Sequence, residues 1–222
     1  LALPCEAFAE YRVASQAELE AALALAKDSS RPLLPLGGGS NVVLPPQLDA
    51  IVLRAADDRL RVLDETAEAV ILRVGAAHGW HALVEHTLRE GYFGLENLAL
   101  IPGAVGAAPV QNIGAYGREL EDFVVNVHGY DLESGQAREL SRAACAFAYR
   151  DSVFKAALRD RFLITALDLR LSRVAELRVD YPSLATQMAS GAYDETPAGV
   201  CRAVVDLRRR RLPDPDTHPN AG

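Results

Sequence analysis

The apolar and polar positions of this chain follow helical and strand periods in turn, and they predict a mixed α and β fold. Residues 15–27 predict a helix, which Ser15 opens with a capping box ahead of good helix formers. Short apolar runs at residues 33–36 and 51–53 predict two strands on either side of a glycine-rich turn. These elements together predict a small β-α-β unit that ends near Ala55.

A second unit is expected after it. Residues 69–74 predict a strand, and residues 80–89 predict a helix that Gly91 would end, because glycine readily takes the left-handed conformation found after helices. Further on, residues 124–132 and 137–140 predict a β-hairpin.

The strongest strand signal lies at residues 162–171, where apolar side chains fill most positions of both alternating faces. A last helix is expected from Thr196 to about Arg210, with Pro197 in its first turn. The GxGxxG fingerprint of Rossmann folds is absent. The pattern therefore predicts an α+β fold with mixed sheets rather than a Rossmann fold.

Composition narrows the classes of protein that fit. The chain has 222 residues, half of them apolar, and a formal net charge of −7. That acidic balance argues against nucleic acid or an anionic membrane as partner, since neither would be attracted over long range. No apolar run approaches the roughly 20 residues of a membrane span, and residues 1–10 lack the basic start of a signal peptide. We expect a cytoplasmic monomer without membrane insertion.

The cysteines give no sign of a metal or disulfide framework. Cys5, Cys145 and Cys201 are odd in number, far apart and outside any CxxC pair. Cys145 and Cys201 stand among alanines and valines, which predicts buried packing thiols. We expect no metal site.

A glycine-rich segment at residues 94–117 is the most informative stretch of the chain. Its five glycines and two prolines lie among small apolar residues, with few polar side chains between them. Glycines let main-chain N–H groups approach a ligand, and side-chain amides donate and accept hydrogen bonds in one plane. The segment suits a bulky, flat, phosphate-bearing cofactor, and a loop-rich piece of core is the alternative.

Residues 37–41, of sequence GGGSN, form a second glycine-rich site between two predicted strands. Consecutive glycines allow successive N–H groups to turn towards one anion, and the Ser40 hydroxyl adds a donor. An ordinary strand-to-strand turn is the alternative.

Four blocks, residues 35–44, 94–117, 149–155 and 212–222, occur in an order and spacing that resembles the UDP-N-acetylenolpyruvoylglucosamine reductase family of bacterial cell-wall synthesis. The resemblance implies a two-subdomain FAD-binding fold of the PCMH (vanillyl-alcohol-oxidase-like) type. It also implies FAD as cofactor, NADPH as reductant, and reduction of the UDP-sugar substrate, UDP-N-acetylglucosamine enolpyruvate, to UDP-N-acetylmuramate.

The resemblance also divides the chain. It implies a first FAD-binding subdomain at residues 1–55, a second at residues 56–211, and the start of a linker to a substrate domain at residues 212–222. The family's proton-donor serine would follow Gly222 directly, and its catalytic glutamate would lie further on. We therefore expect this sequence to be a flavin-binding fragment that completes the reaction poorly or not at all.

The cofactor residues follow from the same motifs, with the GGGSN loop at the pyrophosphate and the glycine-rich segment around the flavin. Many relatives carry an acidic residue at Gly38 and a serine at Ala107 or Ala108, so backbone contacts must serve there. For Ile164, plain core packing is the alternative. The residues expected to contact the cofactor are Gly38, Gly39, Ser40, Asn41, Ile101, Pro102, Gly103, Ala107, Ala108, Asn112, Gly114, Ala115, Tyr116, Ile164 and Arg208.

Arg150, in the block YRDSVFK, matches the family's catalytic arginine. Reduction of an enolpyruvyl ether builds negative charge on the conjugated carboxylate, and a guanidinium fits a carboxylate through two parallel hydrogen bonds. A surface ion pair between Arg150 and Asp151 is the alternative.

The resemblance assigns Tyr149, Tyr181 and Arg211 to the substrate. Tyr181 could instead be an exposed loop residue that packs on nothing. The run from Arg208 to Arg211 could serve the dipole of the last helix, since basic residues are favourable at a helix C-terminus. Two further functions stay open for the chain: another oxidoreductase of the same fold, and a non-catalytic flavin-binding module.

Overall fold

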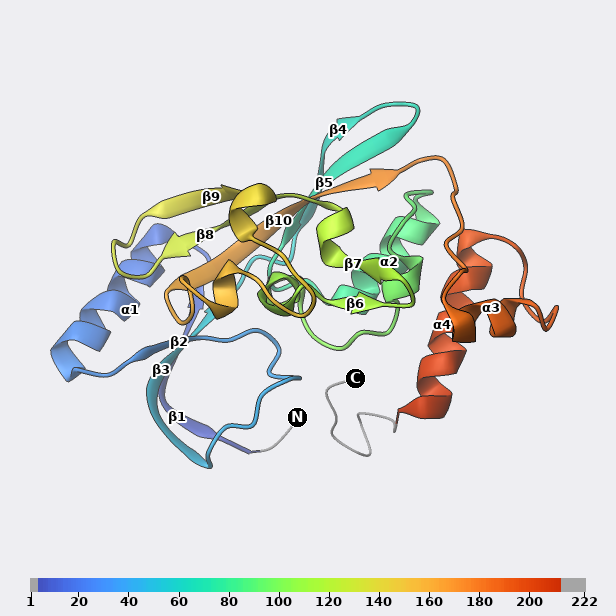
Figure 1. Ribbon diagram of the computed structural model, residues 1–222. Coiled ribbons are helices and arrows are strands. Elements are labelled where there is room, and N and C mark those ends of the chain that lie inside the picture. The colour runs from blue at the N-terminus through green and yellow to red at the C-terminus, as the bar shows by residue number, and fades with distance from the viewer. Residues whose placement is uncertain (1–3, 213–222) are drawn as a thin grey trace.

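The computed structural model describes residues 4–212, and its smaller main sheet is parallel. Strand β3 (Gln47–Ala55) lies between β1 (Glu6–Val13) and β2 (Leu33–Pro35) and pairs in parallel with both. Helix α1 (Gln16–Ser29) connects β1 to β2 and packs on this sheet (Figure 1). The predicted helix and the two predicted strands, β2 and β3, are confirmed. Strand β1 was missed although its exposure alternates as in a strand, because two of its four less exposed positions are alanine.

The capping box that predicts α1 is present. The Ser15 hydroxyl accepts a hydrogen bond from the Glu18 N–H, and the Glu18 carboxylate accepts one from the Ser15 N–H at 2.9 Å. Leu19 and Ala22 on the inner face of the helix are fully buried. Local capping and one apolar face thus explain where this helix begins and which side packs.

The larger main sheet has five antiparallel strands. Its order is β4 (Leu60–Glu65), β5 (Ala69–Gly75), β10 (Phe162–Ser172), β8 (Val124–Asp131) and β9 (Ala137–Ser141). β10 is the central strand and is buried along most of its length, which explains its nearly continuous apolar sequence. The predicted β5, the hairpin β8–β9 and β10 are all confirmed.

One apolar cluster joins the two main sheets. Leu19 on α1 and Leu53 on β3 share it with Leu132 and with Leu163 on β10. The Gln16 amide donates a hydrogen bond to the Gly135 carbonyl in the β8–β9 turn at 3.0 Å. The small sheet is therefore held against one end of the large one.

The remaining helices lie at the end of the molecule opposite α1 (Figure 1). Helix α2 (Trp80–Arg89) ends before Gly91, whose φ of 74° confirms the predicted stop. Helix α4 (Pro197–Arg211) begins after Thr196 as predicted, and the unpredicted α3 (Pro182–Met188) packs beside it. The short elements are η1 (Glu96–Leu98), η2 (Val105–Gln111), β6 (Gly114–Ala115), β7 (Arg118–Glu119), η3 (Leu120–Asp122), η4 (Ala143–Cys145) and η5 (Val153–Lys155).

Cys145 and Cys201 are buried as predicted, and burial raises the pKa of each thiol to about 11. Within residues 4–212, no helix is long and apolar enough to cross a membrane. In the same range, no group of three or more His, Cys, Asp or Glu side chains could hold a metal ion. The expected linker at residues 213–222 lies outside the described residues.

Candidate functional site

Two cavities lie on either side of a contact between the GGGSN loop and η2. The first, here called the sheet cavity, has a volume of about 410 Å³ and lies between the small sheet and β10. The second, the loop cavity, has a volume of about 290 Å³ and lies between the GGGSN loop and the glycine-rich segment. Six residues line both cavities: Pro35, Leu36, Gly37, Ala104, Ala107 and Val110.

The GGGSN loop is not a hairpin turn, since the strands it connects run parallel. A Cβ atom at Gly37 would lie 2.8 Å from the Cβ of Ala107, so only glycine permits this approach. The Ser40 hydroxyl donates to the Pro102 carbonyl at 3.4 Å, and the Asn41 amide donates to the Gln111 side chain at 3.1 Å. These contacts bring together the two segments that the sequence assigns to one ligand.

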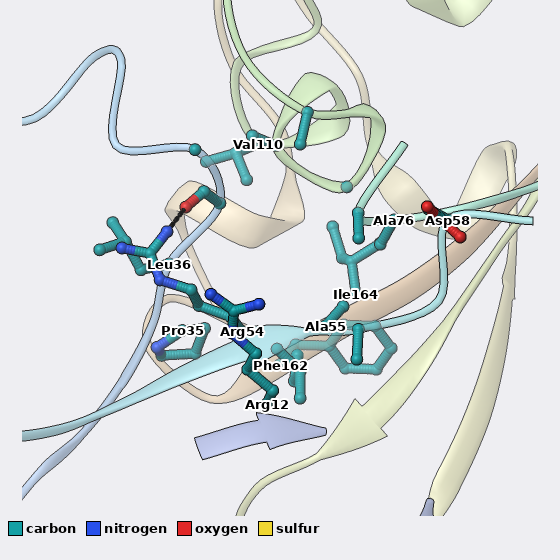
Figure 2. Close-up of a pocket in the computed structure, with 18 residues that line it drawn as sticks. Arg12, Pro35, Leu36, Arg54, Ala55, Asp58, Ala76, Val110, Phe162 and Ile164 are labelled. Atoms are coloured by element: carbon teal, nitrogen blue, oxygen red, sulfur yellow. Dashed lines mark hydrogen bonds between the residues drawn. The ribbon is translucent and has the colours of Figure 1, made fainter. Parts of the chain in front are cut away.

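Two arginines that the sequence reasoning missed face the sheet cavity (Figure 2). Arg12 on β1 and Arg54 on β3 are register neighbours, and Arg54 donates a hydrogen bond to the Gly37 carbonyl. Phe162 and Ile164 on β10 line the same cavity. Arg54 directly follows the buried run of β3, but one charged residue at the end of a strand gives no sequence signal of a ligand site.

Ile164 is a core residue that also borders a cavity. It is 7% exposed within the large core cluster, and it also lines the sheet cavity. Eight other predicted cofactor residues line at least one of the two cavities, and Ala107 lines both: Gly38, Gly39, Ser40, Asn41, Ile101, Pro102, Ala107 and Ala108. Gly103 lies beside them, since a Cβ atom there would be 3.0 Å from the Ser40 hydroxyl.

Arg150 lies against the glycine-rich segment and does not bind the carboxylate of Asp151. Its guanidinium donates to the carbonyl of Asn112 at 3.3 Å and to that of Gly114. A Cβ atom at Gly114 would lie 2.8 Å from the Arg150 Nη1 atom, so glycine makes room for this side chain. The backbone of Arg150 is left-handed, with φ of 55°, and the Lys155 amine donates to its carbonyl at 2.8 Å.

Asn112 differs from the expectation that its amide contacts a cofactor. The side chain is fully buried, and its Nδ2 atom donates to the Glu119 carboxylate at 2.8 Å and the Ala148 carbonyl at 3.2 Å. Its Oδ1 atom accepts from the Glu121 N–H at 3.0 Å. The side chain therefore holds the fold of the segment, which a linear sequence could not reveal because Ala148 is distant in the chain.

The three tyrosines predicted at the site differ in their burial and in their contacts. Tyr181 packs edge-on against Tyr116, with ring centroids 5.5 Å apart, so the alternative that it packs on nothing is wrong. Tyr116 is nearly buried, and this burial raises the pKa of its hydroxyl. Tyr149 is 79% exposed beside the Arg150 guanidinium. Neither Tyr116 nor Ala115 lines one of the two cavities.

The arginines at the end of α4 also separate into different environments. The Nε atom of Arg208 donates to the Leu100 carbonyl at 3.2 Å, and burial lowers the pKa of this guanidinium. Arg211 lies exposed in the last turn. Arg208 thus contacts the residue before Ile101 without lining either cavity, while Arg211 also complements the helix dipole.

The sequence profile of the FAD binding domain family matches residues 9–141. The chain belongs to the FAD binding domain family. The match covers most of the small sheet, most of the residues that line the two cavities, and four of the five strands of the large sheet. The predicted FAD-binding fold and the FAD cofactor are therefore confirmed.

Two curated relatives of this chain carry the same name. UDP-N-acetylenolpyruvoylglucosamine reductase of Pseudomonas fluorescens is 44% identical over 94% of this chain and 61% of its own length. The enzyme of that name from Xanthomonas axonopodis pv. citri is 47% identical over 92% of this chain and 58% of its own length. The chain thus spans about three fifths of the length of these relatives.

Solved structures support the fold. The crystal structure of UDP-N-acetylenolpyruvylglucosamine reductase from Thermus caldophilus superposes with a TM-score of 0.60 at 22% identity, over 95% of this chain and 64% of that one. A VAO-type flavoprotein from Myceliophthora thermophila superposes with a TM-score of 0.51 at 15% identity, over 74% of this chain and 31% of that one. The predicted vanillyl-alcohol-oxidase-like architecture is confirmed.

The residues of the two cavities fit a bound FAD. Glycine and alanine supply three of the six residues that line both cavities, so main chain is open there to a flat ring system. The sheet cavity has two arginines and the loop cavity has Lys155, which suit a molecule with a central diphosphate. A Cβ atom at Gly38 would lie 3.6 Å from the Cα of Gly103, an ordinary contact, so the packing there does not require glycine.

Proposed function

We propose that the protein is a UDP-N-acetylenolpyruvoylglucosamine reductase, which oxidises NADPH and forms UDP-N-acetylmuramate for peptidoglycan synthesis. The identity of 44% to a curated reductase over 94% of this chain supports the proposal. The observation that carries it is the anchoring of Arg150 on the carbonyls of Asn112 and Gly114, in the segment predicted to surround the flavin. We further propose that it acts in the cytoplasm as a monomer.

The GGGSN loop would hold the cofactor's diphosphate through main-chain N–H groups and the Ser40 hydroxyl. Ile101, Pro102 and Ala108 would face the flavin from the other side of the loop cavity. Arg208 would act on the cofactor through the main chain of the segment, since its side chain donates to the Leu100 carbonyl. Asn112 would act by fixing the fold of the segment, since its side chain donates to the Ala148 carbonyl outside it. When bound, FAD supplies the transfer of a hydride from NADPH to the substrate.

Arg150 would stabilise the charge that develops on the substrate carboxylate. Its side chain is only partly buried, and the carbonyls of Asn112 and Gly114 orient its planar group without neutralising it. A fixed positive charge that needs no reorganisation is the main requirement for stabilising a developing negative charge. The exposed Tyr149 beside it would contact the substrate.

The substrate's diphosphate would lie towards the end of α4. Arg211 is exposed there, and the charges of Arg208 and Arg211 act to lower the pKa of the Tyr116 hydroxyl, against the larger effect of burial, which raises it. Tyr181, packed edge-on against Tyr116, would cover the substrate from the N-terminus of α3.

The test compares Arg150→Ala and Arg150→Lys in the intact enzyme. Arg150→Ala should slow reduction of UDP-N-acetylglucosamine enolpyruvate by roughly 10²–10³-fold, because the developing carboxylate charge loses its fixed partner. Arg150→Lys should recover part of the rate, since it restores charge but not the planar fork. Flavin reduction by NADPH should stay normal in both variants. An unchanged rate of substrate reduction in Arg150→Ala would remove this role.

A further inference from the structure

Lysine is rare in this chain. Of its 23 basic residues only Lys27 and Lys155 are lysines, and the rest are arginines. Lys155 is also the only charged side chain among the described residues that line the loop cavity. The loop cavity is therefore lined by a compact ammonium group on a flexible stem, although nearly all other basic residues of the chain are arginines.

Lys155 is held in a defined place. It is the last residue of η5, which begins after Ser152. The Ser152 hydroxyl donates to the Val110 carbonyl at 2.7 Å and accepts from the Phe154 N–H at 3.2 Å, so it ties η5 to η2. The Lys155 amine donates to the Arg150 carbonyl at 2.8 Å.

The ammonium group has donors to spare. It carries several N–H bonds and no acceptor, and the Arg150 carbonyl uses one of them. The residue is exposed, so the other N–H bonds are open to a ligand in the loop cavity. Across the cavity, Ser40 and Asn41 are neutral, and the Asn41 amide is bonded to Gln111.

Lys155 is the one described side chain of the loop cavity that can place a full positive charge beside a bound anion. The chain has a net charge of −7, and the glycine N–H groups of the GGGSN loop offer only partial charges. Charge-assisted hydrogen bonds to phosphate are shorter and stronger than neutral ones. The position of Lys155 therefore fits a phosphate group better than an uncharged flavin ring.

We propose that Lys155 binds a phosphate of the flavin nucleotide in the loop cavity while it holds the Arg150 carbonyl. The same amine then joins the cofactor to the left-handed turn that carries Arg150, so that a bound cofactor fixes the position of the arginine. This inference rests on the proposed function for the roles of the GGGSN loop and Arg150. It adds a phosphate-binding residue that positions the arginine from outside both glycine-rich segments.

The two lysines provide a direct experiment. The whole chain is treated briefly with acetic anhydride, alone, with FAD and with riboflavin, and acetylation of each lysine is measured by peptide mass spectrometry. FAD should protect Lys155 several-fold and leave Lys27, exposed on α1, unprotected. Riboflavin, which has the same ring system but no phosphate, should protect neither residue.

Substitution provides a second measurement. Lys155→Met should weaken FAD binding by roughly 10- to 100-fold, the loss expected for a hydrogen bond to a charged group. Its riboflavin affinity should not change. Lys155→Arg should keep most of the FAD affinity, and the matched control Lys27→Met should bind both flavins as the unsubstituted chain does.

Each alternative result has a definite meaning. Equal acetylation of Lys155 with and without FAD, or equal weakening of FAD and riboflavin by Lys155→Met, would overturn the phosphate contact alone. A chain that binds FAD but shows normal substrate reduction after Arg150→Ala would overturn the proposed catalytic role and leave the phosphate contact standing. An unsubstituted chain that binds no flavin would overturn both.

Discussion

The contact between Gly37 and Ala107 predicts that a substitution at Gly37 destabilises the protein and that a second substitution at Ala107 restores the stability. In Gly37→Ala, the new Cβ atom would lie 2.8 Å from the Cβ of Ala107, which is closer than such atoms pack. The φ of Gly37 is not in the left-handed region, so steric overlap rather than backbone strain is the cost. Overpacking of this kind costs about 1–3 kcal/mol.

Removing the opposing methyl group should relieve the overlap. In Gly37→Ala/Ala107→Gly, the nearest remaining atom to the new Cβ is the Cα of residue 107 at 3.8 Å, an ordinary contact. Ala107→Gly alone should cost about 1 kcal/mol or less, from added backbone freedom in a short helix. The double variant should therefore resemble Ala107→Gly more closely than Gly37→Ala.

Two assays measure the effect. Urea unfolding gives the loss of stability, and FAD titration followed by flavin fluorescence gives the loss of affinity. If the whole overpacking cost is lost from the free energy of FAD binding, the affinity of Gly37→Ala for FAD falls roughly 5- to 150-fold. Gly38→Ala is the stability control, since its Cβ atom would meet nothing closer than 3.6 Å. The reasoning fails if Gly37→Ala is as stable and binds FAD as well as the parent, or if the double variant is no better than Gly37→Ala.

Two buried carboxyl groups should make stability depend on pH in opposite directions. Burial alone would raise the pKa of Asp168, but hydrogen bonds from Arg73 and His128 outweigh it and hold the pKa well below the usual range. Asp168→Asn should therefore lower the free energy of unfolding by about 1.5–3 kcal/mol at pH 7. In urea unfolding, this loss should shrink as the pH falls below about 4, through the native pKa. A loss that stays constant with pH would contradict the assignment. Burial raises the pKa of Glu96, so its favourable contribution is present at low pH and lost as the pH rises through the native pKa. Glu96→Gln, which keeps an acceptor for the Gly94 N–H, should gain stability relative to the parent between pH 4 and pH 8, and an equal difference at both pH values would refute this.

The sequence predicts those elements whose signals are local. The start of α1 follows from the Ser15 capping box, and the end of α2 follows from Gly91. Strand β4 gave no such signal, because nearly all of its side chains are exposed and its place depends on pairing with β5. Strand β1 likewise depends on its parallel pairing with β3, which lies about 40 residues further along the chain.

The glycine-rich parts of the candidate site were predictable from the sequence. The charged side chains that line its cavities were not. The GGGSN loop and the glycine-rich segment show their role through composition, and the structure brings them together at Gly37 and Ala107. Arg12, Arg54 and Lys155 were missed, because a single charged residue in a linear sequence cannot be told from one that faces solvent. Their placement beside the cavities depends on strand register and on the packing of η5 against η2.

The most direct test of the account is the visible spectrum of the purified chain after FAD is added and the excess removed, repeated anaerobically with NADPH. The account predicts a retained, structured flavin band that bleaches on reduction. Flavin that is retained but not bleached would contradict the reductase function and favour a flavin-binding module. Loss of all flavin would contradict the central claim, that the GGGSN loop and the glycine-rich segment together hold FAD.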